Sequence, residues 1–185
     1  MHQRQKIIPL AKGLVLEIGL GSGLNLQYYD PGKVTRLWGL EPSAEMWKTA
    51  QSKIGNIPID FVYLQASAED IPLEDELVDT IVMTYTLCTI PNPLKALSEM
   101  RRVLLPTGKL LFCEHAEAPD RRVSNWQRWL NPVWKNIAGG CNLNRDIPAL
   151  ITSGGFVINK LETLYLPGWR PASYNVWGQA VKASG

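Results

Sequence analysis

The sequence has no strong excess of charge of either sign. Its 185 residues include 19 lysines and arginines against 17 aspartates and glutamates, a formal net charge of +2, with no long run of one sign. Proteins that hold nucleic acid over a broad surface need a basic face, because contacts with phosphates supply much of the affinity. The balance therefore predicts no nucleic-acid partner, although a small, locally basic site stays open.

Long apolar runs are also missing. The first six residues are polar, and no apolar core of a secretion signal follows them. No stretch approaches the roughly 18 consecutive apolar residues of a membrane span. We therefore expect a cytoplasmic protein without a transmembrane segment, for which contact with a membrane surface is the least favoured arrangement.

Cysteine and histidine are scarce. The three cysteines, Cys88, Cys113 and Cys141, are widely spaced without a C-x-x-C pair, and the only histidines are His2 and His115. An odd number of cysteines at such spacings is typical of reduced and mostly buried thiols. The same scarcity of ligands predicts no metal site.

What the sequence does contain is an alternation of short apolar runs with helical patterns. Runs typical of buried strands lie at 14–18, 34–40, 59–64, 77–84 and 109–114, and helices are expected near 24–29, after an N-cap at Ser43, and over 93–105. Two further strands, near 156–164 and 173–181, have no helix between them and should pair antiparallel. The pattern predicts an α/β fold, a seven-stranded and mostly parallel sheet with helices on both faces and the last strand antiparallel.

A glycine-rich turn closes the first predicted strand. Residues 16–23 read L-E-I-G-L-G-S-G. In an open parallel sheet, ligands bind beyond the carboxyl ends of the strands, and glycines there let a ligand approach the main chain. A dinucleotide-binding turn would place its third glycine where Leu24 stands. The spacing favours a cofactor without a pyrophosphate, and a plain strand-to-helix turn is the alternative.

An acidic residue follows the second predicted strand. Glu41 lies twenty residues past Gly21, where a carboxylate can accept hydrogen bonds from both hydroxyls of a ribose. The competing interpretation is a solvated glutamate at a helix start. We favour the ribose contact.

Four motifs in order resemble those of class I S-adenosylmethionine-dependent methyltransferases. They are the glycine turn after Glu17, the segment A-S-A-E-D-I-P at 66–72, the strand V-D-T-I-V at 78–82, and R-V-L-L-P-T-G-K-L at 102–110. The resemblance implies a Rossmann-like fold and S-adenosylmethionine as cofactor, with S-adenosylhomocysteine as product. It also divides a single domain, 1–185, into a cofactor half at about 13–115, a substrate or lid insertion at 116–155 and terminal strands at 156–182.

Carried over position by position, the resemblance implies a set of cofactor contacts. Glu17 and the backbone of the glycine turn would hold the methionine end, the residues at the end of the second strand the ribose, the 67–69 segment the adenine, and the Thr84 backbone the methionine amine. Many relatives have aspartate where Ser67 stands, so the adenine contact would fall to the Ala68 amide. The implied set is Glu17, Gly19, Leu20, Gly21, Gly23, Glu41, Pro42, Ser67, Ala68, Glu69 and Thr84.

Segments beyond the cofactor half are similar to one subgroup. L-C-T-I at 87–90, F-C-E-H at 112–115 and G-C-N-L-N-R at 140–145 look like the alkyl-thiol methyltransferases of vertebrates, the methyltransferase-like seven group, and their bacterial relatives. The resemblance implies a small and apolar methyl acceptor with a thiol nucleophile. Only about thirteen residues precede the first predicted strand, which predicts a shortened or missing lid over the cofactor.

Two residues are candidates for acting on the acceptor. A thiol must react as its thiolate, and a nearby base or cation raises the thiolate fraction. His115 follows the fifth predicted strand at the ligand-bearing edge and can exchange a proton near neutral pH; a structural histidine is the equal alternative. Tyr85, directly after the fourth strand, is the second candidate. Residues 142–146 and the cysteines are expected to stabilise loops and pack.

The segment after the fifth strand is rich in tryptophan. Trp126, Trp129 and Trp134 recur at helical spacing, with arginine and lysine nearby, and Asn131-Pro132 suggests that a second helix starts there. We rank core or lid packing first, a wall for an apolar substrate second and a membrane surface third.

The prediction is an S-adenosylmethionine-dependent methyltransferase of a small acceptor, favoured as an alkyl thiol. Methylation of a quinone or of another small carbon or oxygen acceptor is the alternative within the class. A nicotinamide oxidoreductase and a non-catalytic cofactor-binding module are the alternatives outside it. Oligomeric state is left open.

Overall fold

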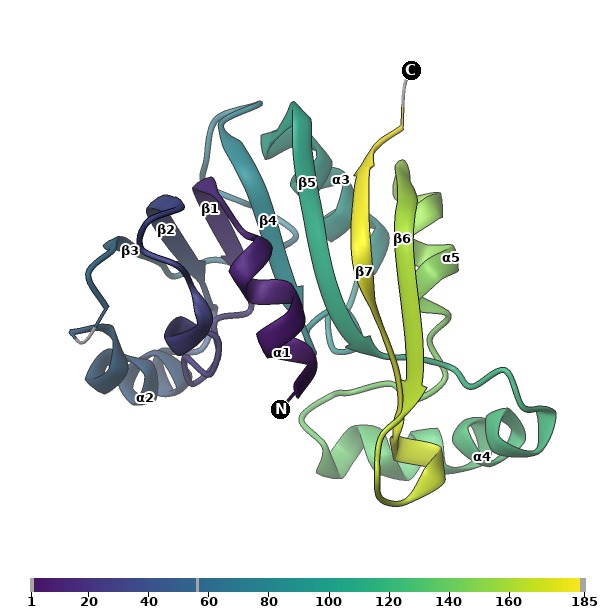
Figure 1. Cartoon of the computed structure of the whole chain (residues 1–185). Coiled ribbons are helices and arrows are strands. Elements are labelled where there is room, and N and C mark those ends of the chain that lie inside the picture. Colours follow the sequence, from purple (N-terminus) through teal and green to yellow (C-terminus); the bar gives the residue numbers. More distant parts are fainter. Residues whose placement is uncertain (1, 56, 184–185) are drawn as a thin grey trace.

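A single seven-stranded sheet runs through the protein in the order β3-β2-β1-β4-β5-β7-β6. It is seen in a computed structural model that describes residues 2–55 and 57–183. Figure 1 shows the sheet with helices on either side of it. The strands are β1 Gly13–Ile18, β2 Val34–Leu40, β3 Asp60–Leu64, β4 Val78–Thr84, β5 Leu104–His115, β6 Phe156–Tyr165 and β7 Tyr174–Lys182.

Helices cover both faces of the sheet. The α-helices are α1 His2–Ile7, α2 Ala44–Ile54, α3 Pro93–Val103, α4 Arg121–Ile137 and α5 Ile147–Ser153, and the 3₁₀ turns are η1 Ile8–Leu10, η2 Leu26–Tyr28 and η3 Arg170–Ala172. On one face, Ile7 of α1 and Ala50 of α2 share a core with Val15 and Val82. On the other, α3 and α5 pack against the sheet, behind it in Figure 1.

The strand directions confirm the predicted fold. The neighbours from β3 to β5 are paired parallel, while β7 runs antiparallel to both β5 and β6 between them. After β1 the chain moves outward to β2 and β3, and then returns to place β4 on the other side of β1. The loops after β1 and β4 therefore diverge, which opens a crevice at the carboxyl edge of the sheet.

Two local predictions need correction between strands. The helix expected at 24–29 is only the 3₁₀ turn Leu26–Tyr28, because Asp30-Pro31-Gly32 reverses the chain before a full helix can form. The fifth strand begins at Leu104 rather than Lys109. Val78 pairs with Leu104 and Thr80 with Lys109, so Pro106-Thr107-Gly108 forms an irregularity inside the strand.

The predicted break at Asn131-Pro132 is also wrong, since α4 continues from Arg121 to Ile137 with Pro132 inside it. Asn131 does not act as a cap. Its side chain accepts a hydrogen bond from the Leu143 amide at 2.8 Å and donates one to Asn142 at 3.3 Å. Pro132 and Arg128 are both exposed, so the carbonyl that loses its helical partner can bond to water.

In the part of the chain that the structure describes, no helix combines the length and the apolar character that crossing a bilayer requires.

Candidate functional site

A crevice of about 450 Å³ lies beyond the carboxyl ends of β1, β2 and β4. Its volume falls within the roughly 300–1,000 Å³ typical of small-molecule sites. The glycine turn, the ends of β2 and β4, the first turn of α1 and the loop after α4 all contribute to it. The lining residues are Arg4, Gly19, Leu20, Gly21, Ser22, Leu24, Asn25, Glu41, Met46, Thr84, Tyr85, Thr86, Thr89 and Gly139.

The glycine turn has a backbone conformation that side chains disfavour. Gly19, Gly21 and Gly23 have φ of 69°, 55° and 70°, in the left-handed region that glycine enters without strain. A Cβ at Gly19 would also lie 2.4 Å from the Thr86 hydroxyl, and one at Gly23 would lie 2.8 Å from Leu26. The main chain of the turn can therefore form the crevice wall only with glycine at these positions.

Glu41 ties the end of β2 to the glycine turn. Its two carboxylate oxygens accept hydrogen bonds from the backbone amides of Gly21 and Ser43, each at 2.9 Å. The side chain is 8% exposed and lines the crevice. Each oxygen uses one lone pair in these bonds, so the carboxylate can still accept hydrogen bonds from a ligand.

Glu17 lies beneath the crevice rather than in its wall. The carboxylate is 1% exposed, and it accepts hydrogen bonds from Asn25 at 2.9 Å and from the Tyr29 hydroxyl at 2.8 Å. Burial raises the pKa of Glu17 to about 7. Asn25, which does line the crevice, also donates to the Thr84 hydroxyl at 2.9 Å. Glu17 can therefore influence a ligand through Asn25.

The end of β4 presents Tyr85 to the crevice. Tyr85 has φ of 55°, which is rare for a residue other than glycine. Burial raises its pKa well above the usual value for a tyrosine, so the phenol stays protonated and can donate a hydrogen bond. The Arg4 guanidinium lies 4.8 Å from the centre of the Tyr85 ring, and Arg4 donates to the Asn25 side chain at 3.3 Å.

Glu114 holds the loop after β4. One oxygen accepts hydrogen bonds from the amides of Thr86 at 2.8 Å and Leu87 at 3.1 Å, and the other from Cys88 at 3.3 Å. The side chain is fully buried, and burial raises the pKa of Glu114 to about 7 despite these amides, which act in the opposite direction. Its contacts are with backbone, so it organises the loop that carries Tyr85.

His115 lies behind Tyr85, which separates it from the crevice. Its ring packs edge-on against Tyr85 with 4.9 Å between centroids, and its Nδ1 is 3.9 Å from the sulfur of Cys141. Cys141 in turn lies 3.4 Å from Cys88, sulfur to sulfur. His115 is not among the lining residues of the crevice, so its contact with an acceptor would be through Tyr85 or after a shift of that ring.

The segment after β3 follows the same edge of the sheet but lies outside the crevice lining. The Ser67 hydroxyl accepts from the Glu69 amide at 3.1 Å, and Glu69 accepts from the Asn92 amide at 3.0 Å. Ala68 is buried. At the end of β2, the Tyr63 hydroxyl donates to the Glu41 carbonyl at 2.9 Å. The adenine contacts of residues 67–69 stay a prediction.

The crevice brings together about half of the predicted site. Gly19, Leu20, Gly21, Glu41, Thr84 and Tyr85 line it, whereas Glu17, Gly23, Pro42, Ser67, Ala68, Glu69 and His115 do not. Outside the glycine turn, sequence reasoning missed Arg4, Leu24, Asn25, Met46, Thr86, Thr89 and Gly139. Asn25 lies four residues past Gly21, so its place just after the turn could have identified it. Arg4 and Gly139 are distant from the motifs in sequence, and only the fold brings them to the crevice.

The loop at 142–146 stabilises structure, as predicted. Asn142 donates through its side chain to the carbonyls of Cys88 at 2.9 Å and Gly140 at 3.1 Å, and Arg145 donates to the Leu87 carbonyl. Asp146 caps α5 by accepting from the Ala149 amide at 3.0 Å. The three cysteines are free and buried, which confirms the prediction of packed thiols.

The first-ranked interpretation of the tryptophans, core packing, is wrong for two of the three residues. Trp126 and Trp129 are 55% and 72% exposed, so they are neither core nor walls of the crevice. Trp134 is half-buried and lies 6.0 Å from Trp169, between ring centroids. Gln127 and Ser124 occupy the buried face of α4 instead, because Gln127 satisfies three backbone groups of neighbouring loops.

Comparison with known proteins gives a consistent result. Residues 16–112 match the family described as "Methyltransferase domain". The chain is 36% identical to thiol S-methyltransferase TMT1B of Rattus norvegicus over 91% of this chain and 70% of the relative. It is 32% identical to thiol S-methyltransferase TMT1A of Homo sapiens over 94% of this chain and 72% of the relative.

The fold has solved counterparts. An S-adenosylmethionine-dependent methyltransferase from Mesorhizobium loti superposes with a TM-score of 0.71 at 16% identity, covering 98% of this chain and 96% of the other. At that identity the likeness concerns the fold alone.

The buried carboxyl groups make stability depend on pH. Glu17 and Glu114 have a pKa of about 7 in the folded protein, against about 4.3 in an unfolded chain. Between these two pH values the folded state therefore binds more protons than the unfolded state. The stabilisation that these protons provide is fully present below about pH 4.3 and is lost as pH rises through about 7. We expect the contribution of these two groups to the free energy of unfolding to fall by a few kcal/mol between about pH 5 and pH 8. Cys141, whose pKa is lowered by its contacts with Cys88 and His115, acts in the opposite direction.

Urea unfolding across that pH range measures the effect. Glu114→Gln removes one of the two groups and should therefore remove about half of their combined contribution. At low pH it should cost about 1–3 kcal/mol, because an amide nitrogen then faces the backbone donors. The pKa values of Asp30 and Glu99 are lowered by hydrogen bonds, so these two residues change the free energy of unfolding only at more acidic pH. The same pH dependence in the original protein and in Glu114→Gln would contradict this prediction.

Proposed function

From the premise that this chain belongs to the methyltransferase domain family and is an S-adenosylmethionine-dependent methyltransferase, we propose that it methylates the sulfur of a small alkyl thiol. The single observation that supports the acceptor most strongly is the similarity to two proteins named thiol S-methyltransferases, which extends over nine-tenths of the chain. At that coverage the similarity extends beyond the cofactor half into the 116–155 segment, from which Gly139 lines the crevice. The nicotinamide oxidoreductase is no longer an alternative.

The crevice fits the cofactor. Its floor is main chain at Gly19 and Gly21, where a Cβ would strain the turn, and it offers a buried carboxylate at Glu41 with unused lone pairs. When bound there, S-adenosylmethionine supplies an electrophilic methyl group on a positively charged sulfur. We assign the ribose hydroxyls to Glu41 and the methionine end to the glycine turn, Asn25 and Thr84, with Glu17 acting through Asn25. The Ser67–Glu69 segment remains our proposal for the adenine.

The protein has two tasks toward a thiol. It must align the sulfur with the methyl carbon and exclude water, and it must raise the fraction of thiolate, since a free thiol has a pKa of about 8.5. Arg4 is a cation in the crevice wall, next to Tyr85, and its charge favours a thiolate there. The Tyr85 ring contributes to the crevice wall, while its hydroxyl faces the buried Cys113 thiol. We propose His115 as the group that accepts the thiol proton, after the Tyr85 ring that separates it from the crevice has shifted.

A labelled-methyl screen tests the acceptor. The purified protein is incubated with S-adenosylmethionine carrying a labelled methyl group and with alkyl thiols, quinones, phenols and amines of matched size. We expect product with alkyl thiols, at kcat/KM values at least about tenfold above the other classes, because a thiolate stabilised by the cation in the crevice is a stronger nucleophile toward carbon than a phenolate or an amine. Methylation of a quinone or phenol with no thiol product would replace this acceptor with the alternative within the class.

The Glu41 assignment predicts a specific loss of cofactor affinity. Glu41→Gln should weaken S-adenosylhomocysteine binding at least about tenfold, since hydrogen bonds to a charged group contribute about 1.5–3 kcal/mol. Isothermal titration measures the affinity, and thermal unfolding checks that the turn is intact. Glu45→Gln, four residues along and exposed on α2, is the matched control and should bind normally. Equal affinities for the Glu41 and Glu45 variants would remove Glu41 from the site.

The pH dependence of kcat/KM distinguishes the proposed roles of His115 and Arg4. His115→Gln should lower the rate near neutral pH by about 100-fold, with recovery at alkaline pH, where the thiol ionises unaided. Arg4→Gln should move the rising limb of the profile to higher pH without abolishing it. An unchanged profile for His115→Gln would make this residue structural, held between Tyr85 and Cys141.

A further inference from the structure

The outer side of α4 carries a stripe of exposed apolar side chains. Trp126, Trp129, Val133 and Ile137 follow one another at intervals of three and four residues, which places them on one side of the helix. They are 55%, 72%, 64% and 74% exposed. Single exposed apolar residues are ordinary, but a contiguous set marks a surface for interaction. We call these four residues the α4 face.

Contacts on the opposite side of the helix prevent the α4 face from turning inward. Gln127 is 1% exposed, and its side chain bonds to Ala116, Ala118 and Pro171 at 2.8–3.2 Å. Asn131 bonds to the loop at 142–143. The orientation of α4 is therefore fixed, and the stripe stays outside.

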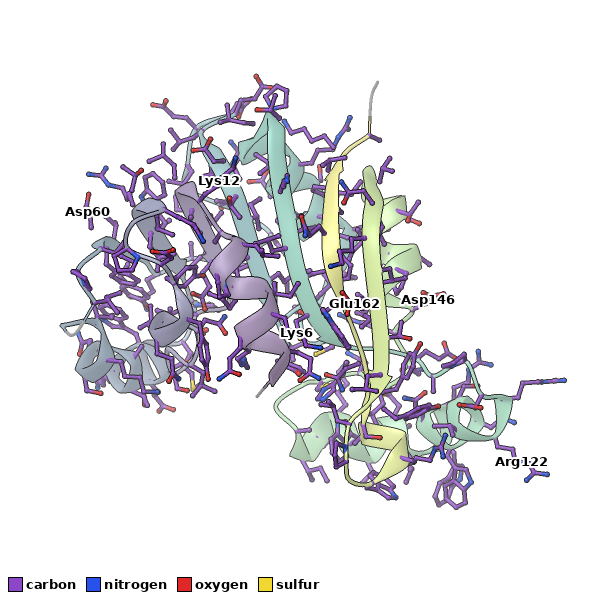
Figure 2. The ribbon with its side chains drawn as sticks, in the orientation of Figure 1. Lys6, Lys12, Asp60, Arg122, Asp146 and Glu162 are labelled. Atoms are coloured by element: carbon purple, nitrogen blue, oxygen red, sulfur yellow. The ribbon has the colours of Figure 1, made fainter. Side chains whose placement is uncertain are left out.

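The charged side chains of α4 itself all have one sign, and one of them, Arg128, is paired with Glu117 just before the helix. The seventeen residues of α4 contain four cations, Arg121, Arg122, Arg128 and Lys135, and no aspartate or glutamate. Arg122 lines a hollow with Trp126 and Trp129, and a second hollow joins it to Trp169 and Arg170 of the neighbouring loop. Figure 2 shows Arg122 pointing away from the body of the protein at the outer end of α4. Tryptophans beside cations on an otherwise apolar surface suit a boundary between hydrocarbon and anionic groups.

We propose that the α4 face binds the surface of a bilayer that contains anionic phospholipids. The tryptophans and the aliphatic residues enter the interface, while the basic side chains extend along it to the headgroups. A second copy of the chain is the other candidate occupant of an apolar face. In a two-fold symmetric contact through α4, however, the cations of both copies would be brought together without acidic partners on the helix.

The α4 face adjoins the crevice. Gly139 lies two residues beyond the end of α4 and lines the crevice wall. An apolar acceptor dissolved in the bilayer would then reach the methyl group without crossing water. This consequence rests on the proposed acceptor, whereas membrane binding does not.

Sedimentation of the full chain with vesicles tests the surface without measuring activity. Vesicles of phosphatidylcholine alone are compared with vesicles of phosphatidylcholine and phosphatidylglycerol. We expect binding to the anionic vesicles that weakens as salt is raised, with a blue shift of tryptophan fluorescence. Trp129→Ser should reduce the partition coefficient about tenfold, and Arg122→Gln about fivefold on anionic vesicles only.

Matched controls come from surfaces away from α4. Val157→Ser removes an exposed valine at the start of β6, and Arg101→Gln an exposed arginine of α3; neither should alter binding. Thermal unfolding confirms that each variant is folded. Absence of binding to anionic vesicles, or equal binding by Trp129→Ser and Val157→Ser, would overturn the proposal. A dimer that Trp129→Ser disperses, without vesicle binding by the original chain, would assign the face to a second copy instead.

Discussion

Buried carboxylates at the ends of three strands hold the crevice open. Glu17 lies in β1, Glu41 directly follows β2, and Glu114 lies near the end of β5. The loops that leave this edge expose backbone amides that need partners. Glu41 bonds to the amides of Gly21 and Ser43, and Glu114 to three amides after β4. The loops thus keep an irregular path around an open space.

The same arrangement explains why the carboxylates differ in their availability to a ligand. Glu17 has both oxygens engaged with Asn25 and Tyr29 deep in the protein, and Glu114 faces only backbone. Glu41 is the one of these three that lines the crevice. Desolvation is the largest influence on Glu17 and Glu114, and it moves both toward their neutral forms near pH 7. A crevice without their charges beneath it is a better site for a thiolate.

Local patterns predicted most of the sheet because buried parallel strands have distinctive sequences. β2 has the bounds expected from its apolar run, and the Ser43 cap accepts a hydrogen bond from Met46, as the pattern indicated. The same reasoning failed for α4. The Asn131-Pro132 pair has the composition of a helix start, but Asn131 is held by a loop eleven residues later in the chain, a contact that no local pattern contains.

The sequence by itself determined the fold class, the glycine turn and the acid after β2, since each follows from a backbone requirement or spacing within a short segment. Only the tertiary structure decided which polar groups meet. Arg4 reaches Tyr85 because α1 packs across the sheet, and Gly139 reaches the crevice because α4 is anchored through Gln127. The exposure of Trp129 was decided in the same way, because helical spacing defines a stripe but not the side of the helix that the rest of the protein covers.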